Sequence, residues 1–446
     1  MNSLPLSRNV IMRLDIVLRT CSNSLLTSKQ ERVSGPNREL MMKKCFVSLV
    51  QAAKIPGVDI FLTILDDHSN ERFIDFLRTE AQSIPHKIVD LDKRGYNNSA
   101  YEQFKVASEC EGLVYIVEDD YLHEEQAIER MLGAYLHLMG EYNTSIVIYP
   151  FDCPLRYGKH VEETILHYDG IRYWRGVTKT ANTMFTHYSV LQEHFKVFKK
   201  LAKEYPKVME DDTINKLYYG KDNQNAPIRA FSPIPSVAYH LGYSTPTAIR
   251  TSHGSWEHLW NRIESWQLIQ GWFYHPEFYQ QVVATMPKVA TAVEIGAWRG
   301  RSTCCLASLI KQSGKFIKLY SVDTWNGSDE QTHRDIIEDM PLDLFEDFKE
   351  NVKMCDVEDV IIPMKMTSVE ASEEFEDGSV DFIMIDGAHD YESVKQDIEA
   401  WMPKLAKNGM IAGDDYSPSW KGVVKAVDEK FGKKVNVAGT TWYVVP

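Results

Sequence analysis

In the first half of the chain, acidic side chains follow directly after two short apolar runs. Asp66 and Asp67 close the segment ILDDHS, and Glu118, Asp119 and Asp120 follow LVYIV. If these runs are strands of an open parallel sheet, carboxylates at their ends face the ligand crevice of that sheet. Carboxylate oxygens bind hard divalent cations, and such a cation can hold a diphosphate. The pattern therefore predicts a metal and nucleotide site, with a plain acidic cap after each strand as the alternative for either group alone.

The second half contains a glycine-rich turn between an apolar run and a helical stretch. The segment VATAVEIGAWRGRST has the spacing Glu294-x-Gly296-x-x-x-Gly300, and Ser302 opens the helix. Glycine lets the backbone approach a ligand closely, and the free amides of a helix N-terminus favour an electronegative partner. Asp323 ends the next apolar run, where an acidic residue can bind ribose hydroxyls. Such a turn predicts a nucleotide-like cofactor, although dinucleotide enzymes use one too.

Three further carboxylates end two later apolar runs. Asp386 follows DFIMI, and Asp414 and Asp415 follow GMIAG. Neighbouring parallel strands end at one sheet edge, so the three can converge, and three oxygen ligands suit Mg²⁺ better than a soft metal. His389 lies three residues after Asp386. An imidazole there can accept a proton near neutral pH, whereas mere solvation is the plainer interpretation of a loop histidine.

These residues need elements that bring strand ends together. Short β-rich runs alternate with helical stretches twice along the chain. The first series covers residues 14–18, 60–65, 113–117 and 145–149, and the second covers residues 289–295, 319–322, 381–385 and 409–412. Strands separated by helices predict βαβ units with mostly parallel sheets. We therefore expect an α/β fold with two domains, residues 1–250 and 288–446, joined by a helical, aromatic-rich connector over residues 251–287.

Composition excludes several classes of protein. The 446 residues suffice for two or three domains, and 49 Lys and Arg against 63 Asp and Glu give a formal charge of −14, which disfavours a nucleic-acid partner. No run approaches the roughly eighteen apolar residues of a transmembrane helix, and the first residues lack a secretory signal pattern. Seven scattered cysteines without a CxxC pair predict neither a disulfide framework nor a zinc site. A cytoplasmic protein is expected, and a homo-oligomer is compatible with the sequence.

Taken together, the acidic motifs of the first half resemble those of nucleotide-sugar glycosyltransferases of the GT-A fold. ILDDHSN resembles the VDDGS-type element, and VEDD resembles the metal-binding DxD motif in a Glu-x-Asp form. The resemblance covers about residues 12–250. It implies a Rossmann-like domain that binds a nucleotide-sugar donor with Mn²⁺ or Mg²⁺ and transfers the sugar to a glycan or glycoconjugate acceptor. The sequence departs from the family pattern in the His of DDHS and in the Glu that begins the metal motif.

The same resemblance implies roles for individual residues. Nucleotide-sugar contacts are implied for Asp66, Asp67, Arg94, Asn98 and Asp119, and metal ligation for Glu118, Asp120 and His240. The segment VMEDDTINKLY supplies the expected base for the acceptor hydroxyl, which is Asp211 or, if the acidic pair is aligned the other way, Asp212. A base of this kind favours inversion at the anomeric carbon. Acceptor contacts are expected in loops, with Tyr173, Trp174 and Arg175 as candidates.

The motifs of the second half resemble those of class I S-adenosylmethionine (SAM) methyltransferases. EIGAWRGRS follows the subset that reads EIGxxxGxS, in which Trp298 stands where ExGxGxG has its middle glycine. DFIMIDGAHDY and IAGDDY resemble the metal-dependent O-methyltransferases of the macrocin type, which methylate sugar hydroxyls. This resemblance spans about residues 264–446 and implies a Rossmann-like domain that uses SAM and Mg²⁺.

Residue by residue, it implies the following sites. SAM contacts are implied for Glu294, Gly296, Ala297, Gly300, Ser302, Asp323, Ser368 and Asp386. Mg²⁺ ligation is implied for Asp386, Asp414 and Asp415, and His389 takes the place of the general base.

Both halves together predict a bifunctional enzyme that transfers a sugar and O-methylates a sugar hydroxyl. Successive steps on one glycan are the simplest relation between the two reactions. Three alternatives stay open to different degrees. The first half could be a silent carbohydrate-binding or acceptor-recognition module, and the second half could be a hydroxylase-like relative on the same scaffold. A nucleotidyltransferase is disfavoured, because the Gly-rich basic loop of such enzymes is absent near the N-terminus.

Overall fold

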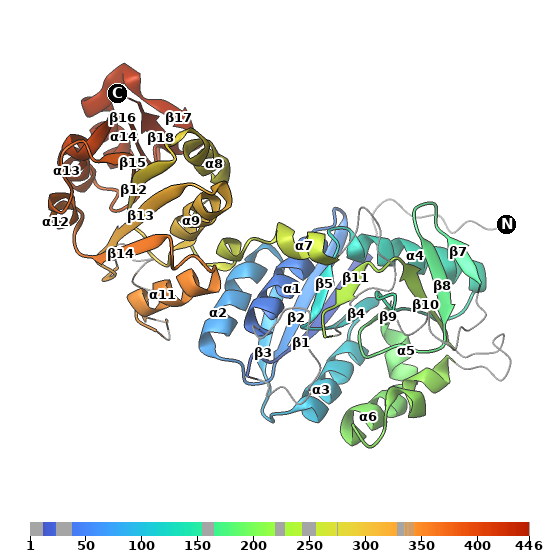
Figure 1. Cartoon of the computed structure of the whole chain (residues 1–446). Helices are drawn as coiled ribbons and strands as arrows, with labels where there is room; N and C mark the ends of the chain where they lie inside the picture. Colours follow the sequence, from blue (N-terminus) through green and yellow to red (C-terminus); the bar gives the residue numbers. More distant parts are fainter. Residues whose placement is uncertain are drawn as a thin grey trace. The chain divides into compact units, whose positions relative to one another are not determined.

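The computed structural model describes residues 12–23, 38–153, 165–218, 228–242, 256–273, 275–327, 334, 337–338, 340 and 342–445. The chain divides into two compact units, Met1–Ile263 and Glu264–Pro446. The boundary falls inside the segment 251–287 that the sequence predicts as a connector. Each unit is an α/β structure with its own mixed sheet, drawn from blue to yellow-green and from yellow to red in Figure 1. No helix among the described residues has the length and apolar character needed to cross a membrane.

The N-terminal unit is built on a nine-stranded sheet in the order β3-β2-β1-β4-β9-β6-β10-β8-β7. Its strands are β1 (Met12–Thr20), β2 (Val58–Asp66), β3 (His86–Asp90), β4 (Leu113–Glu118), β6 (Ile146–Ile148), β7 (Leu166–Tyr168), β8 (Tyr173–Val177), β9 (Met184–His187) and β10 (Arg229–Ile234). The first four are parallel to one another, and β9 runs antiparallel to both β4 and β6. A separate two-stranded sheet pairs β5 (Tyr121–His123) with β11 (Ala238–His240).

Apolar runs in the strands explain this arrangement. Leu14, Ile16, Val17 and Leu18 are all buried in β1, which reads as a continuous apolar run because both faces of a parallel sheet are covered. The helices of this unit are α1 (Arg38–Ala52), α2 (Glu71–Glu80), α3 (Tyr96–Ser108), α4 (Ala127–Tyr142), α5 (Tyr188–Glu193), α6 (Phe195–Glu204) and α7 (Trp256–Arg262). The crossovers that contain α1 to α3 return the chain in the same direction, so β1, β2 and β4 end at one edge of the sheet (Figure 1).

The C-terminal unit has a seven-stranded sheet in the order β14-β13-β12-β15-β16-β18-β17. Its strands are β12 (Val289–Ile295), β13 (Phe316–Asp323), β14 (Ile361–Lys365), β15 (Val380–Ile385), β16 (Leu405–Gly413), β17 (Asn436–Ala438) and β18 (Thr441–Val444). Five strands are parallel, and β18 runs antiparallel to β16 and β17. This is the Rossmann-like arrangement predicted for the second half, with β12 at the centre of the five parallel strands.

Helices cover both faces of this sheet. The helices are α8 (Pro276–Thr285), α9 (Arg301–Ser313), α11 (Leu344–Met354), α12 (Ser368–Glu373), α13 (Tyr391–Trp401) and α14 (Lys421–Phe431). Side chains alternate along a strand, so Phe382 and Met384 of β15 pack with α8, α9 and α11, whereas Ile383 and Ile385 pack with α12, α13 and α14. The sheet is thus held between two apolar cores, and its strand ends are free to carry polar groups.

A buried carboxyl group on α13 gives a test of the fold of the C-terminal unit. Burial raises the pKa of Asp397, on α13, to about 6, and a hydrogen bond with Ser368 opposes that rise. Because the folded-state pKa exceeds the ordinary value, the free energy of unfolding rises as the pH falls from about 6 toward 4. Above pH 6 the buried carboxyl group is ionised, and the full cost of burying its charge lowers the stability.

We expect Asp397→Asn to raise the free energy of unfolding of the C-terminal unit at pH 7.5 by on the order of 1 to 3 kcal/mol. The variant should also gain less stability between pH 6 and pH 4 than the natural protein, because the contribution of Asp397 is gone. Calorimetry of the full chain at several pH values measures both. Glu399→Gln, an exposed carboxylate on the same helix, is the control and should change little. A stability curve of Asp397→Asn that parallels the natural protein would contradict the assignment.

Candidate functional site

The loops that follow the strands of the C-terminal unit enclose a cavity of about 380 Å³. Its wall combines an apolar, tryptophan-rich part with a polar part that contains two carboxylates and an imidazole. It is lined by Gly271, Trp272, Phe273, Gly296, Ala297, Trp298, Arg301, Ser302, Asp386, Gly387, His389, Asp415 and Trp420. A mainly apolar cavity with a few convergent polar groups is the usual form of a small-molecule site.

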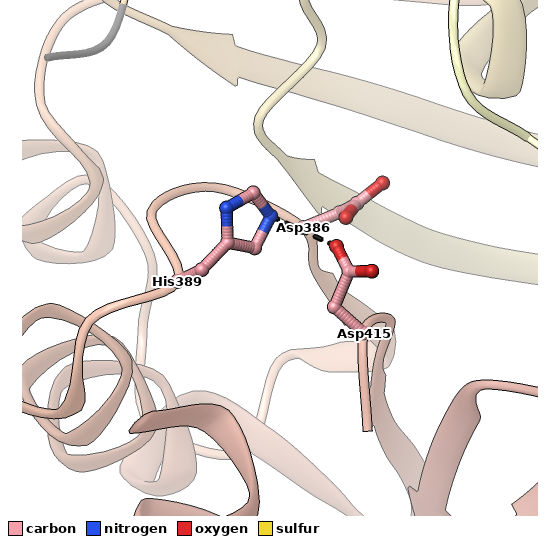
Figure 2. A group of neighbouring side chains, drawn as sticks. All are labelled: Asp386, His389 and Asp415. Carbon is pink, nitrogen blue, oxygen red and sulfur yellow. Dashed lines mark ion pairs between the residues drawn. The ribbon is translucent and has the colours of Figure 1, made fainter. Parts of the chain in front are cut away.

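Asp386, His389 and Asp415 form one compact group in this cavity. Asp386 follows β15, His389 lies in the loop before α13, and Asp415 lies in the loop after β16 (Figure 2). One ligand atom of each lies within 4.8 Å of those of the others, and His389 Nε2 is 2.8 Å from Asp415 Oδ2. Two carboxylate oxygens and an imidazole nitrogen are a donor set that a divalent cation accepts.

The electrostatics of this group also favour a cation. Burial raises the pKa of Asp386 well above its ordinary value, and the negative charges of Asp414 and Asp415 raise it further. A bound cation would relieve this repulsion, since opposite charge favours the ionised carboxylate. The residues present therefore fit a divalent ion.

Asp414 is placed differently from its neighbour Asp415. Its Oδ1 accepts hydrogen bonds from the hydroxyl groups of Thr440 at 2.7 Å and Thr441 at 3.4 Å. The sequence predicts three aspartate ligands, whereas the compact group in the structure contains two of them and His389. The role of Asp414 as a direct ligand stays a prediction.

The glycine turn lines the same cavity, directly beside the backbone of Asp386. Gly296 has φ of 90°, and a Cβ there would overlap the carbonyl oxygen of Asp386. Gly300 has φ of 89°, and a Cβ there would lie 2.9 Å from the ring of Phe348. Only glycine meets both the backbone conformation and the close approach. The turn therefore brings Gly296, Ala297 and Ser302 to the cavity wall.

The remaining predicted SAM contacts have protein partners. Glu294 is fully buried and accepts hydrogen bonds from Tyr279 Oη at 2.9 Å and from the Thr303 hydroxyl. Asp323 accepts from the backbone amides of Trp298 and Trp325 at 2.8 and 2.7 Å. Asp323 therefore anchors the backbone beside the cavity, whereas Glu294 is held by side-chain hydroxyls, and burial raises the pKa of each.

Ser368 lies at the start of α12, where its hydroxyl accepts from Trp401 Nε1 at 3.0 Å. It also hydrogen-bonds the carboxyl group of Asp397. These contacts join α12 to α13. Its contact with SAM stays a prediction.

The tryptophans of the cavity are the residues that sequence reasoning missed. Trp272 is 45% exposed, and its ring centroid lies 6.2 Å from that of Trp298. Trp420 stacks against His389 with 4.2 Å between the ring centroids. The sequence predicts the segment 251–287 as an aromatic-rich connector and gives no sign that Trp272 lines a cavity. Only the position of Trp298 inside the glycine turn gave a signal in the sequence.

In the N-terminal unit, the three acidic residues after β4 have three different partners. Glu118 forms an ion pair with Arg19, and Asp119 with Arg38 at 3.3 Å. Asp120 Oδ2 lies 3.1 Å from His240 Nε2. β5 and β11 make this last contact possible, because Tyr121 pairs with His240 in their register.

Space at the Asp120–His240 pair is kept open by a glycine. A Cβ at Gly242 would lie 2.9 Å from Asp120 Oδ2 and 3.0 Å from His240 Nε2. A carboxylate oxygen and an imidazole nitrogen at this separation can share a cation. The predicted ligands Asp120 and His240 are thus adjacent, whereas the predicted ligand Glu118 is engaged by Arg19.

The predicted nucleotide-sugar residues lie at and after the end of β2, which is separated from β4 by β1. Asp66 is buried, its Oδ2 accepts from Ser69 N at 2.9 Å, and its Oδ1 has no hydrogen-bond partner within the described ranges. Asp67 is buried as well and accepts from Gly95 N at 2.8 Å. Arg94 donates to the carbonyl of Asn23, and Asn98 to the carbonyl of Lys93. The unpaired oxygen of Asp66 is the polar atom of this set that a ligand could satisfy.

The two predicted bases are both exposed, and they differ in their hydrogen bonds. Asp211 has a 59% exposed side chain and accepts from Lys179 at 3.0 Å and Asn215 at 2.9 Å, which lowers its pKa. Asp212 accepts from the backbone amide of Met209.

The acceptor contacts expected in a loop are wrong for two residues. Trp174 is fully buried in β8, and Arg175 is paired with the buried Asp152. Tyr173, also in β8, is half exposed. β8 pairs with β10, so these residues lie in a strand and not in the loop that the sequence suggested.

Residues 293–416 match the sequence model of a family described as a methyltransferase domain. The C-terminal unit is a class I SAM-dependent methyltransferase domain. The match begins in β12 and ends just after Asp415, so it contains the glycine turn and the compact acidic group.

Over 151 residues, the chain is 26% identical to an uncharacterized protein of Sinorhizobium fredii, y4gI. The alignment covers 32% of this chain and 15% of that protein, so the chain spans a small part of the relative's length.

Solved structures of methyltransferases resemble part of the chain. The O-methyltransferase NovP is 18% identical, with 38% of this chain and 78% of NovP covered and a TM-score of 0.31. The TDP-rhamnose 3'-O-methyltransferase CalS11 of calicheamicin biosynthesis is 16% identical, with 38% and 76% covered and a TM-score of 0.28. A SAM-dependent O-methyltransferase of Thermotoga maritima is 14% identical, with 36% and 52% covered and a TM-score of 0.26.

The glycine turn gives a sharp test of the site. Gly296→Ala should weaken binding of S-adenosylhomocysteine by about tenfold or more, because the new Cβ displaces the backbone of Asp386 or of the turn. Isothermal titration calorimetry on the full chain measures the affinity. Gly314→Ala is the matched control, because Gly314 also has positive φ but nothing within 4 Å of its Cβ position. Equal affinities for the two variants would contradict a cofactor role for the turn.

Proposed function

We propose that the C-terminal unit transfers the methyl group of SAM to a hydroxyl group of a sugar in a reaction that needs a divalent ion. One observation carries this proposal. The glycine turn of a methyltransferase domain and the group Asp386, His389 and Asp415 face the same cavity, so a methyl donor and an activated hydroxyl can meet there. The rate then depends on how well acceptor oxygen, methyl carbon and sulfur are aligned.

The roles of the residues follow from their positions. Asp386 and Asp415 would hold the ion, and Thr440 and Thr441 hold Asp414 beside them. When bound, the ion lowers the pKa of an acceptor hydroxyl. His389 accepts the proton of that hydroxyl, and its contact with Asp415 orients the imidazole.

The net charge of the C-terminal unit and the tryptophans of the cavity wall favour an uncharged sugar over a nucleic acid as the acceptor. Residues 264–446 contain 18 Lys and Arg against 31 Asp and Glu, a formal charge of −13, which repels a polyanion. Trp272 and Trp298 offer flat apolar surfaces beside polar groups. A sugar ring has apolar C–H faces that can stack on such surfaces and hydroxyls that can reach the ion.

His389→Gln tests the base. We expect kcat for methyl transfer to fall by about 10² to 10⁴-fold, because proton transfer by a positioned base contributes that factor. The affinities for S-adenosylhomocysteine and for Mg²⁺ should stay near those of the natural protein. Glu399→Gln, which changes an exposed carboxylate near the end of α13, should leave kcat unchanged. A large loss of Mg²⁺ affinity in His389→Gln would instead make His389 a ligand of the ion.

For the N-terminal unit, we infer transfer of a sugar from a nucleotide-sugar donor, with the ion held by Asp120 and His240. The contact between these two side chains at the sheet edge supports this inference, as does the unpaired oxygen of Asp66 at the end of β2. The Asp211 carboxylate is the proton acceptor in this inference, and the hydrogen bonds from Lys179 and Asn215 that lower its pKa make it a weaker base. The alternative is a carbohydrate-binding module that serves the methyltransferase.

Asp120→Asn separates these alternatives. In the full chain, UDP-, GDP- or dTDP-sugar with Mn²⁺ should raise the melting temperature of the natural protein by mass action. Asp120→Asn should lose most of this shift, because the ion loses a charged ligand. Asp59→Asn is the control, since Asp59 lies near the opposite end of β2 and is exposed. No shift with any nucleotide sugar, together with binding of free glycans, would favour the carbohydrate-binding module.

A further inference from the structure

The loop between β16 and α14 contacts His389 on two sides. Asp415, near the start of this loop, meets the edge of the imidazole at Nε2, 2.8 Å away. Trp420, at the end of the loop, lies against the face of the imidazole, with 4.2 Å between centroids and 31° between the ring planes. One contact leaves a ring free to turn about its bond to Cβ, whereas an edge contact and a face contact together define its orientation.

The backbone of the same loop also lies against the backbone around His389. Gly422, the second residue of α14, has no side chain, and a Cβ there would lie 2.5 Å from the carbonyl oxygen of His389 and 2.7 Å from the amide nitrogen of Tyr391. Any larger residue would push the two segments apart. Trp420 is itself held, because its amide donates to Ser417 O at 3.0 Å and its carbonyl accepts from Val424 N at 3.2 Å.

We propose that Trp420 and Gly422 form a positioning element that holds the His389 imidazole in the orientation needed for proton transfer. The inference rests on the methyltransferase function proposed above. It adds two residues that act through His389 and need no contact with the reacting atoms of SAM or of the acceptor. Trp420 acts through its ring, and Gly422 acts by permitting the close approach of α14. A base displaced by about 1 Å can cost on the order of 100-fold in rate, so a positioning element of this kind affects turnover more than binding.

A spectroscopic test needs no acceptor. In the full chain with ¹³C-labelled histidine, the ring protons of His389 should be shifted upfield by the ring current of Trp420 and should show nuclear Overhauser contacts to the indole. The His389→Asn spectrum assigns the signals. Trp420→Ala should remove the upfield shift, and Trp420→Phe should keep part of it. Trp272→Ala is the matched control, because Trp272 lines the same cavity but packs on Trp298.

A kinetic test connects the geometry to the reaction. Trp420→Ala should lower kcat for methyl transfer by about tenfold or more while the KM for SAM stays within about threefold, and Trp420→Phe should restore most of kcat. Gly422→Ala should lower kcat in the same way with the tryptophan still present. This second variant keeps the test decisive if Trp420→Ala does not fold.

The outcomes separate this inference from the proposed function. Absence of the upfield shift and of the contacts in the natural protein would overturn the inference, as would a folded Trp420→Ala protein with unchanged kcat. Presence of both, in a protein that binds no S-adenosylhomocysteine, would overturn the proposed function and leave the His389–Trp420 geometry in place.

Discussion

The C-terminal site depends on the approach of the Gly296 backbone to that of Asp386. β12 and β15 are parallel neighbours, and the amide of Asp386 donates to Ile295 O at 2.8 Å. The pairing therefore continues to the point where both chains leave the sheet. A side chain at position 296 would overlap the Asp386 carbonyl, so glycine is what lets the cofactor turn and the acidic group share one cavity. Asp323 anchors the same turn by accepting from the amide of Trp298, and the buried Glu294 lies near the end of β12, just before Gly296. Both residues thereby help to hold the Gly296 backbone against that of Asp386.

The negative charge of the two acidic groups is compensated in different ways. In the N-terminal unit, arginines neutralise Glu118 and Asp119, which leaves Asp120 to meet His240. In the C-terminal unit, Asp386 has two acidic neighbours, and the imidazole of His389 is the group that lowers its pKa. Repulsion between carboxylates raises the free energy of the empty site, and this repulsion is what a cation relieves. The protein itself therefore compensates much of the negative charge at the first site, whereas the carboxylates of the second site keep more of their mutual repulsion.

The loop from Asp415 to Trp420 shows how a short segment can serve several purposes. Its first residue belongs to the acidic group, its last residue covers His389, and the helix that follows carries the glycine that permits this packing. Asp415 adopts φ of 60°, a left-handed conformation that turns the chain sharply after β16. This turn sends Asp414 toward Thr440 and Asp415 toward His389, so two adjacent aspartates have different surroundings.

The sequence by itself determined the α/β class, the strand ends that carry carboxylates, and the glycine turn, because alternation, apolar runs and glycine spacing are local properties of the chain. The sequence also indicated that His389 lies near Asp386, because only three positions separate the two residues in one loop. Tertiary structure alone decided that Asp415 rather than Asp414 joins His389, that Arg19 engages Glu118, and that Trp174 and Arg175 are buried. It also decided that Trp420 packs on His389 and that Glu294 accepts a hydrogen bond from Tyr279. Each of these depends on which side chains from distant segments meet at one place, and the direction of a side chain after a turn is set by backbone angles and packing that no short stretch of sequence contains.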